Sequence, residues 1–423
     1  MTMAFHIFFA LFGVGIPLMV SLAELIAIIK KDADFMAMAQ RWVFVMTVLF
    51  VVGAISGTIV SIVFVTLLPP FMAIVSKVII LPFNLETYAF FLEAIFLGIY
   101  AYTWNRFKNQ WLHWLTSLPI IIGALASAFF ITTVNAFMST PQGFTDVNGV
   151  ISNVNQWTAM FNPTTPNETT HSILAYYATT AFVFAAVAAF QFMRRRKMDA
   201  EGYRKKMLVF SLVVAMVFSL AVVISGDTSA RSIAHNEPEK FATMEGVMDT
   251  ESDAPLTLGG ITTPNGIKDG LVIPGMLSFL VGGSRNVIVT GLSAFDPSTW
   301  PELTIHYYFD GMAIIGFIML GVPLLFFFAL WKRRKRWAFS KLAAWAIWIT
   351  GILSIIGVEL GWMLTEEGRQ PYTIRGYLLT ANAFTNSPVA LAYATIFPVL
   401  YIILSIVTPW ILLAHYNKHQ LTP

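Results

Sequence analysis

Nine apolar stretches, each about 18 residues or longer, constrain the fold of this chain more than any other feature. Each can cross the ~30 Å hydrocarbon core of a bilayer as one α-helix. Only 12% of the 423 residues are charged, against roughly 25% in ordinary soluble domains. The sequence therefore predicts an all-α integral membrane protein with about nine transmembrane helices. The predicted spans are 3–29, 43–68, 85–104, 112–136, 171–193, 207–225, 306–330, 342–364 and 387–414.

Lysine and arginine set the expected orientation of these spans, because both accumulate in cytoplasmic loops. If the N-terminus lies outside, 19 of the 26 basic residues fall on cytoplasmic segments, including the runs 194–197 and 332–336. We therefore expect the N-terminus outside and the C-terminus in the cytoplasm. The opening "MTMAFHIFFALFGVG" has no basic leader and no small-residue cleavage site, so we interpret it as a first span rather than a removed signal.

Three predicted outer segments are long, namely 69–84, 137–170 and 226–305. Segments of such length are usually functional or disordered. The first is expected to contain a short interfacial helix. The third lies between the sixth and seventh spans and contains a helix-like "PEKFATMEG" and an apolar "GLVIPGMLSFLVGG", which is too rich in glycine for a further span. We therefore expect one transmembrane domain over 1–423, with 226–305 as an inserted outer loop.

Charge and cysteine content exclude several classes of function. The net charge is only +3, so nucleic-acid binding has no electrostatic support. The chain contains no cysteine, which rules out disulfides, thiolate zinc sites, iron–sulfur clusters and covalently attached c-type haem. Any cofactor must be held by histidine, methionine or carboxylate.

Two carboxylates interrupt the apolar run "LETYAFFLEAIFLGIYAYTW", namely Glu86 and Glu93. An ionisable group inside a bilayer costs at least ~2.5 kcal/mol, so each is a candidate functional residue. Their spacing of seven residues places both on one helix face, about two turns apart. Two structural interpretations remain open. Glu86 could stabilise a first helical turn, and Glu93 could make an interhelical hydrogen bond in its protonated form.

Four further residues, His6, His171, Met312 and Glu359, are expected in the same outer half of the membrane. Unrelated polar residues would scatter across both halves. A lone histidine often only packs helices together, and a lone methionine nearly always does. Taken together, however, the set suits iron porphyrin, which needs an apolar slot between helices and accepts His, Met or carboxylate-type axial ligands.

Other metal enzymes suit the sequence less well. A haem–copper oxidase needs a cluster of histidines, and the chain has seven in all. His113, His415 and His419 are expected on the inner side, and His235 and His306 in or beside the large loop. A bis-histidine cytochrome b would pair histidines about thirteen residues apart on two helices, and no such arrangement is present.

Six ordered motifs spread over nearly the whole chain resemble subunit I of the cytochrome bd quinol oxidases. The segments "GRQP" and "PEKFATMEG" are the most specific of them. The motifs are "FHIFF", "ETYAFFLEAIFLGIYAYTWNR", "HSILAYYATTAF", "PEKFATMEG", "FDGM" and "VELGWMLTEEGRQPY".

The resemblance implies a copper-free haem enzyme of the prokaryotic cytoplasmic membrane that oxidises quinol near the outer surface and reduces dioxygen to water. By this resemblance His171 and Met312 would be the axial ligands of a low-spin haem b. His6 and Glu359 would serve two high-spin haems, a second haem b and a haem d, with Glu86 beside them. The resemblance leaves open which of these residues ligates which high-spin haem.

The same resemblance assigns roles in proton and quinol chemistry. Glu93 would belong to a chain of acids that relays protons to the oxygen site. Lys240 and Glu245, on the outer loop that the family calls its Q-loop, would bind and deprotonate quinol. From spacing alone, these two residues would instead be read as a surface salt bridge of little energetic value.

The "GRQP" motif places Arg369 and Gln370 in the quinol or haem-propionate region, with Trp362 also expected to contact a cofactor. Without the motif, Arg369 would be read as a cation that snorkels to the interface. The resemblance also implies a second multi-helix subunit, cytochrome bd subunit II, and allows a small single-helix subunit.

The chain departs from the family pattern at several positions. Asp310 stands where the family usually has an arginine, and Ile355 and Tyr372 each replace a tryptophan. Near the end of the second span, "SIVFVTLLPP" stands where the family usually has a Glu-Phe-Gln-Phe-Gly segment. These departures bear on the haem d content, the electron route between haems and the quinol specificity.

Three alternatives remain open at this point. The first is a bd-type oxidase in which the high-spin sites hold only haem b. The second is a secondary transporter that uses Glu86, Glu93 and Glu359 as proton or cation sites; it would carry no pigment. The third is a non-catalytic haem-binding partner that keeps only the low-spin haem.

Overall fold

The protein is an all-α membrane protein, as the sequence predicts. A computed structural model describes residues 2–147, 149–194, 201–385 and 388–418. Within these ranges, nine helical segments are long and apolar enough to cross a membrane. They are α1 (Thr2–Lys30), α2 (Ala33–Leu67), α4 (Ile80–Tyr102), α5 (Gln110–Leu115) together with α6 (Ser117–Ser139), α8 (Thr165–Met193), α9 (Glu201–Asn236), α12 (Ile305–Trp331), α14 (Lys341–Glu367) and α16 (Pro388–Lys418).

Short elements connect the spans. The short helices are α3 (Pro69–Val78), α7 (Gln156–Met160), α10 (Pro238–Glu245), α11 (Met276–Gly282), α13 (Lys335–Ala338) and α15 (Thr380–Ala383), with 3-10 turns η2 (Leu292–Ala294) and η3 (Pro297–Thr299). Four antiparallel hairpins pair β1 (Thr145–Val147) with β2 (Val150–Ser152), β3 (Leu256–Leu258) with β6 (Leu271–Ile273), β4 (Ile261–Thr263) with β5 (Gly266–Lys268), and β7 (Tyr372–Ile374) with β8 (Leu378–Leu379).

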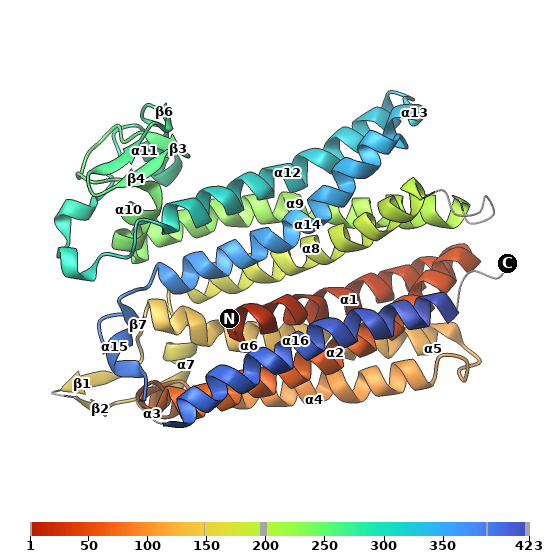
Figure 1. The fold of residues 1–423 in the computed structure, drawn as a ribbon, viewed down its shortest axis with the longest axis horizontal. Helices are drawn as coiled ribbons and strands as arrows, with labels where there is room; N and C mark the ends of the chain where they lie inside the picture. The colour runs from red at the N-terminus through yellow and green to blue at the C-terminus, as the bar shows by residue number, and fades with distance from the viewer. Residues whose placement is uncertain (1, 148, 195–200, 386–387, 419–423) are drawn as a thin grey trace.

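The long helices run side by side, and the short elements gather at the two ends of the bundle (Figure 1). All the strands, with α3, α7, α10, α11 and α15, lie at one end, which we call the loop end. Helices α5 and α13 lie at the other, which we call the opposite end. The long segment between α9 and α12 forms most of the loop end in the upper part of the view.

The short helices agree with the sequence predictions. A helix does occupy 69–78, where an interfacial helix is predicted, with prolines in its first turn. The segment "PEKFATME" forms α10, which begins at Pro238 and ends before Gly246, whose φ of 69° is a left-handed conformation that glycine adopts without strain. The apolar piece after it forms β6 and α11 rather than a tenth span, as predicted.

Several helices begin earlier or end later than predicted, because polar or proline-containing stretches beside the apolar runs are also helical. Helix α2 begins at Ala33 rather than residue 43, α4 begins at Ile80 rather than residue 85, and α9 continues to Asn236, so the loop starts about eleven residues later than predicted. Apolar runs mark the part of a helix that lies in lipid, but hydrogen bonding carries the helix beyond it. The basic residues Arg195, Arg196 and Lys197, used in the orientation argument, and His419 lie outside the described residues.

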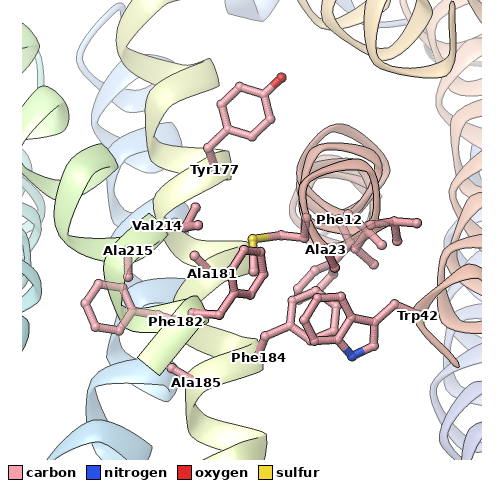
Figure 2. Packing of buried hydrophobic residues seen from close by; sticks show 14 of the residues in the cluster. Phe12, Ala23, Trp42, Tyr177, Ala181, Phe182, Phe184, Ala185, Val214 and Ala215 are labelled. Carbon is pink, nitrogen blue, oxygen red and sulfur yellow. The ribbon is translucent and has the colours of Figure 1, made fainter. Parts of the chain in front are cut away.

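Helices α1 and α8 form the centre of the bundle. In their most apolar stretches 67% of α8 and 61% of α1 is buried, against 17% of α16 and 22% of α4, which face outward. Figure 2 shows why α8 can be central: Ala181 and Ala185 let its backbone approach α9, where Ala215 is equally small. On the side toward α2, the Trp42 and Phe184 rings fill the gap, with centroids 4.3 Å apart.

Candidate functional site

His171 and Met312, the predicted axial pair, line the same cavity. It lies between α8, α9, α12 and α14, and about 600 Å³ of space there, part of it open to solvent, is not filled by protein atoms. Its wall is mostly apolar, and it also includes Trp362, whose indole N–H donates to the Tyr176 hydroxyl at 2.9 Å. An apolar slot between helices with few polar groups is typical of a cofactor pocket. The prediction that Trp362 lies beside this cofactor position remains a prediction, but its place in the wall agrees with it.

The hydrogen bonds of His171 leave one ring nitrogen available to a metal. Its Nδ1 lies 2.9 Å from the Ser225 hydroxyl, which itself donates to the carbonyl oxygen of Val222. Because the single hydroxyl hydrogen is used in that bond, Nδ1 must carry the hydrogen that joins the two side chains. A neutral imidazole has only one N–H, so Nε2 keeps its lone pair. This is how proteins usually orient a metal-ligating histidine.

His6 is held in the same way on the other side of the bundle. Its Nδ1 lies 3.0 Å from the Ser56 hydroxyl, which donates to the carbonyl oxygen of Gly53. Nε2 again keeps its lone pair. Gly57, one residue further along α2, makes room for the ring, since a side chain there would come within 3.1 Å of His6 Cε1. Two histidines 165 residues apart in the chain therefore share one serine-based arrangement.

In two other buried histidines, both ring nitrogens are hydrogen-bonded. His113 bonds Glu24 through Nδ1 and the carbonyl oxygen of Tyr100 through Nε2. His306 bonds the carbonyl oxygens of Met244 and Gly259 through its two nitrogens. The structure thus separates histidines that could ligate a metal from histidines that hold the fold together.

Met312 approaches α14 closely enough to require a glycine opposite it. A side chain at Gly361 would come within 3.0 Å of the Met312 sulfur. The sulfur therefore lies at the contact between α12 and α14, in the wall shared with His171. A thioether and an imidazole nitrogen facing one apolar cavity are a donor set that fits haem iron.

Glu86 and Glu93 both lie on α4, as the sequence predicts. Helix α4 begins at Ile80, so Glu86 lies well inside the helix rather than at its first turn, and the interpretation of Glu86 as a capping residue is wrong. Its Oε1 instead accepts a hydrogen bond from Ser127 of α6 at 2.9 Å. Glu93 is 6% exposed and packs against Gly123, where an added Cβ would lie 3.0 Å from its own.

A buried polar cluster surrounds Arg369 at the loop end. The guanidinium is 4% exposed and donates to Glu366 at 2.7 Å and to Asn135 at 3.3 Å. The Asn135 amide in turn donates to the other oxygen of Glu366. Arg369 is therefore a buried, positioned cation and not a residue that snorkels to the interface. Its Nε, however, has no partner within the described part of the protein.

A second cavity opens beside this cluster, with about 250 Å³ of unfilled space that includes open solvent, and its lining contains three predicted residues, Lys240, Arg369 and Gln370. Lys240 is 5% exposed and pairs with Glu237 at 3.3 Å. The second oxygen of Glu237 and one buried oxygen of Glu168 have no partner among the described residues. Buried polar atoms without partners are costly, so this cluster suits a polar ligand.

Glu245 lies apart from Lys240, although both belong to α10. It is not in the wall of the second cavity but near Asp310 of α12. Burial raises the pKa of Glu245 from 4.5 to about 8, and the charge of Asp310 adds to the shift. Both side chains are buried and Lys240 pairs with Glu237, so Lys240 and Glu245 do not form the surface salt bridge that their spacing alone would suggest.

Asp310, which stands where the family usually has an arginine, anchors the loop to α12. Its carboxylate accepts a hydrogen bond from the backbone N–H of Gly259 and lies 3.4 Å from Nε2 of His306. The charge reversal thus creates a contact between α12 and the β3–β4 connection.

The structure brings some predicted residues together and keeps others apart. His171, Met312 and Trp362 share one cavity, and Lys240, Arg369 and Gln370 share another. His6, Glu86, Glu93, Glu359 and Glu245 line neither of these two cavities. The supporting residues Ser56, Ser225, Asn135, Glu237 and Glu366 were not predicted. Two of them carried a signal in the sequence, since Glu366 lies inside "VELGWMLTEEGRQPY" and Glu237 directly precedes "PEKFATMEG".

Comparison with known proteins places the chain in one family. The family described as cytochrome bd terminal oxidase subunit I matches residues 1–420. A protein of Bacillus subtilis (strain 168), provisionally named cytochrome bd menaquinol oxidase subunit I, is 37% identical over 99% of this chain and 95% of its own length. A second protein of that organism, cytochrome bd ubiquinol oxidase subunit 1, is 28% identical over 99% and 92% of the two chains.

A solved structure agrees with the sequence matches. The bd oxidase from Geobacillus thermodenitrificans contains a chain that superimposes with a TM-score of 0.93, is 39% identical, and is matched over 99% of this chain and 96% of that one. The chain therefore belongs to the family of cytochrome bd terminal oxidase subunit I.

Proposed function

We propose that this chain holds haem through His171, Met312, His6 and Glu359 and binds quinol beside Lys240 and Arg369. The family is one of quinol:oxygen oxidoreductases, and the chain is a multi-pass protein of the prokaryotic cytoplasmic membrane. The observation that carries the residue assignment is the shared serine arrangement, which leaves Nε2 of both His6 and His171 with a free lone pair inside an apolar bundle.

His171 and Met312 would together hold a low-spin haem b in the cavity that they both line. His6 and Glu359 would serve the high-spin haems, a second haem b and a haem d or a further haem b, with Glu86 beside them. When bound, the haems carry electrons from quinol to dioxygen. Ser225 and Ser56 would fix the two imidazoles in the tautomer that presents Nε2.

The second cavity would receive the quinol headgroup. Lys240 and Arg369 place two positive charges beside it, which favours a deprotonated quinol oxygen. The unpartnered oxygen of Glu237 can accept a hydroxyl proton. Glu245 would act from the far end of α10 as a second proton acceptor, since burial and Asp310 keep its pKa near physiological pH.

Glu93 and Glu86 would pass protons along α4 toward the high-spin site. Ser127 holds Glu86 in place, and Glu93 is buried against α6. The orientation expected from the basic residues puts the loop end outside, so that quinol protons leave on that side. The family pairs this subunit with subunit II, and a small single-helix subunit completes the proposed complex.

Optical spectroscopy of the complex, purified with its companion subunit, tests the proposal. A reduced-minus-oxidised spectrum should show haem b, and a band to the red of haem b would identify haem d. His6→Ala should abolish oxygen consumption while the low-spin band remains. A colourless wild-type complex would contradict the proposal and favour the transporter alternative. If the wild type binds haem but His6→Ala loses every haem band, only the assignment of His6 to a separate site would be wrong.

A further inference from the structure

A second group of buried titratable side chains lies far from the loop end and has no part in the function described so far. Glu24 of α1, Tyr100 of α4 and His113 of α5 are 1%, 0% and 3% exposed. They meet near the opposite end of the bundle, where α1 and α4 end and α5 begins. Three ionisable groups from three helices, all buried in a membrane protein, call for a physical explanation.

The hydrogen bonds within this group fix the number of its protons. Nε2 of His113 lies 3.0 Å from the carbonyl oxygen of Tyr100, so Nε2 must carry a hydrogen. The Tyr100 hydroxyl donates to Oε2 of Glu24 at 2.5 Å. Nδ1 of His113 lies 2.6 Å from Oε1 of Glu24, a distance that requires one hydrogen between them. That hydrogen belongs either to an imidazolium facing a carboxylate or to a carboxylic acid facing a neutral imidazole.

The pair of Glu24 and His113 therefore holds one mobile proton, for which either partner can serve as host. The pair is buried, but His113 directly follows an exposed segment, residues 105–112. The rest of the group is enclosed: the ring of Tyr100 stacks on His113 with centroids 4.5 Å apart, and Trp104 meets the imidazole edge-on at 4.8 Å.

Helix α4 connects this group to the carboxylates of the site. Tyr100, Glu93 and Glu86 follow one another at intervals of seven residues, so they share one face of α4, and each step spans about 10.5 Å. Helix α6 supplies small or hydroxyl-bearing residues along the same path. Ser127 bonds Glu86 and Gly123 packs on Glu93.

The path continues to the opposite end of α6. There the Ser117 hydroxyl contacts the Ser21 hydroxyl of α1 at 2.8 Å, three residues before Glu24. Between Tyr100 and Glu93 the wall is apolar, with Leu97 and Ile120 both buried. One end of the row thus lies beside solvent and the other beside the candidate high-spin ligands.

We propose that Glu24 and His113, together with Tyr100, take up protons at the opposite end of the bundle and supply them to Glu93. This inference rests on the proposed function, in which Glu93 relays protons for dioxygen reduction. A proton from solvent adds to Oε2 of Glu24 while the shared proton resides on Nδ1 of His113. The Tyr100 hydroxyl then releases its own proton toward Glu93 through water and recovers the proton from Oε2 of Glu24, so that each group returns to its starting protonation state.

Proton uptake by the whole complex, haem-loaded and with its companion subunit, tests the proposal. Reduced enzyme is mixed with oxygen, uptake is followed with a pH-sensitive dye, and the oxidation of the haems is followed by absorbance in the same mixture. Glu24→Gln should slow uptake at least ~10-fold, since a positioned proton donor is worth ~100-fold or more, while the haem spectrum and the reduction of haem by quinol stay as in the wild type. Infrared difference spectra should also lose a carboxyl band.

Two further variants keep the test decisive. Tyr100→Phe retains the ring stacking on His113 and should also slow proton uptake. If Glu24→Gln does not assemble, the result for Tyr100→Phe tests the proposal. Asp34→Asn removes a half-exposed carboxylate near the same end and should leave uptake unchanged.

Unchanged uptake in Glu24→Gln and Tyr100→Phe, with haems intact, would overturn the proposal, as would equal slowing in Asp34→Asn. Neither result would touch the proposed function. That function fails instead if the wild-type complex binds no haem or does not oxidise quinol.

Discussion

The two ends of the bundle each bury a cluster of charged side chains, but they complete its hydrogen bonds differently. At the loop end, Arg369, Glu237 and Glu168 each leave a buried polar atom without a partner in the described structure. At the opposite end, both carboxylate oxygens of Glu24 and both ring nitrogens of His113 are bonded within the protein.

This difference indicates which cluster can bind a ligand and which can hold a proton. A buried polar atom without a partner costs free energy, so it persists where a ligand or water supplies the bond. A closed cluster cannot admit a ligand but can store a proton, because its bonds already connect donor and acceptor. The same contrast separates the histidines: His171 and His6 have an open nitrogen, whereas His113 and His306 do not.

The largest effect on haem binding is expected from removing a histidine whose Nε2 has no hydrogen bond to the described residues. His171→Ala should eliminate the low-spin haem band entirely, because no other described side chain with a free imidazole nitrogen lines that cavity. The reduced-minus-oxidised spectrum of the purified complex measures it. His113→Gln, which alters a closed histidine, should keep the band. An unchanged spectrum in His171→Ala would break the distinction between the two kinds of histidine.

A smaller effect is expected from the serine that orients the imidazole. Ser225→Ala removes the acceptor for the Nδ1 hydrogen of His171 and should weaken haem retention by ~10–100-fold, the usual cost of losing such a partner. Haem content after dilution and gel filtration measures it. Ser229→Ala is the control, because Ser229 lies on the same helix and donates instead to the carbonyl oxygen of Asn167. Equal haem loss in both variants would mean that Ser225 acts only through packing.

The pH dependence of stability sharpens the comparison at α10. The pKa of Glu245 is raised in the folded protein, from 4.5 to about 8, by burial first and by Asp310 second. The folded state therefore binds more protons than the unfolded state within this window, and the free energy of unfolding falls as pH rises through it. Thermal unfolding of the wild type across the window should show this decline, and Glu245→Gln should flatten it. An equal decline in both proteins would assign the pH dependence to another group.

The smallest effect belongs to an exposed ion pair. Asp34→Asn leaves Lys206 still paired with Asp32 at 2.6 Å, and both partners are partly exposed. Solvent-screened pairs of this kind contribute about 0–1 kcal/mol, so the midpoint of thermal unfolding should hardly move. A large decrease would show that this surface cluster matters as much as the buried ones.

Much of the fold could be predicted because it depends on local chemistry. Nine apolar runs predicted nine spans, and the proline and glycine flanking "PEKFATME" predicted α10. Helix boundaries were less predictable, because Asn236 and Asp34 lie in polar turns that extend helices beyond the apolar runs. The apolar run marks the part of a helix that lies in lipid, whereas backbone hydrogen bonds determine the residue at which the helix ends.

The candidate site divides in the same way. The residue types, His6, His171, Met312 and the carboxylates Glu86 and Glu93, were visible in the sequence because polar groups are rare in apolar spans. Which histidines keep a free nitrogen was not visible, since it depends on Ser56 and Ser225, which lie about fifty residues away in sequence. Nothing in the one-dimensional pattern distinguishes those serines from the others.

By itself, the sequence determined that the chain spans a membrane as helices, that only histidine, methionine or carboxylate can hold a cofactor, and which family motifs it carries. Only the tertiary structure decided that His171 and Met312 share a cavity, that Lys240 faces Arg369 rather than Glu245, and that Glu24 meets His113. The physical reason is that burial in lipid acts on each residue separately, whereas a hydrogen bond needs two partners whose meeting depends on how the helices pack.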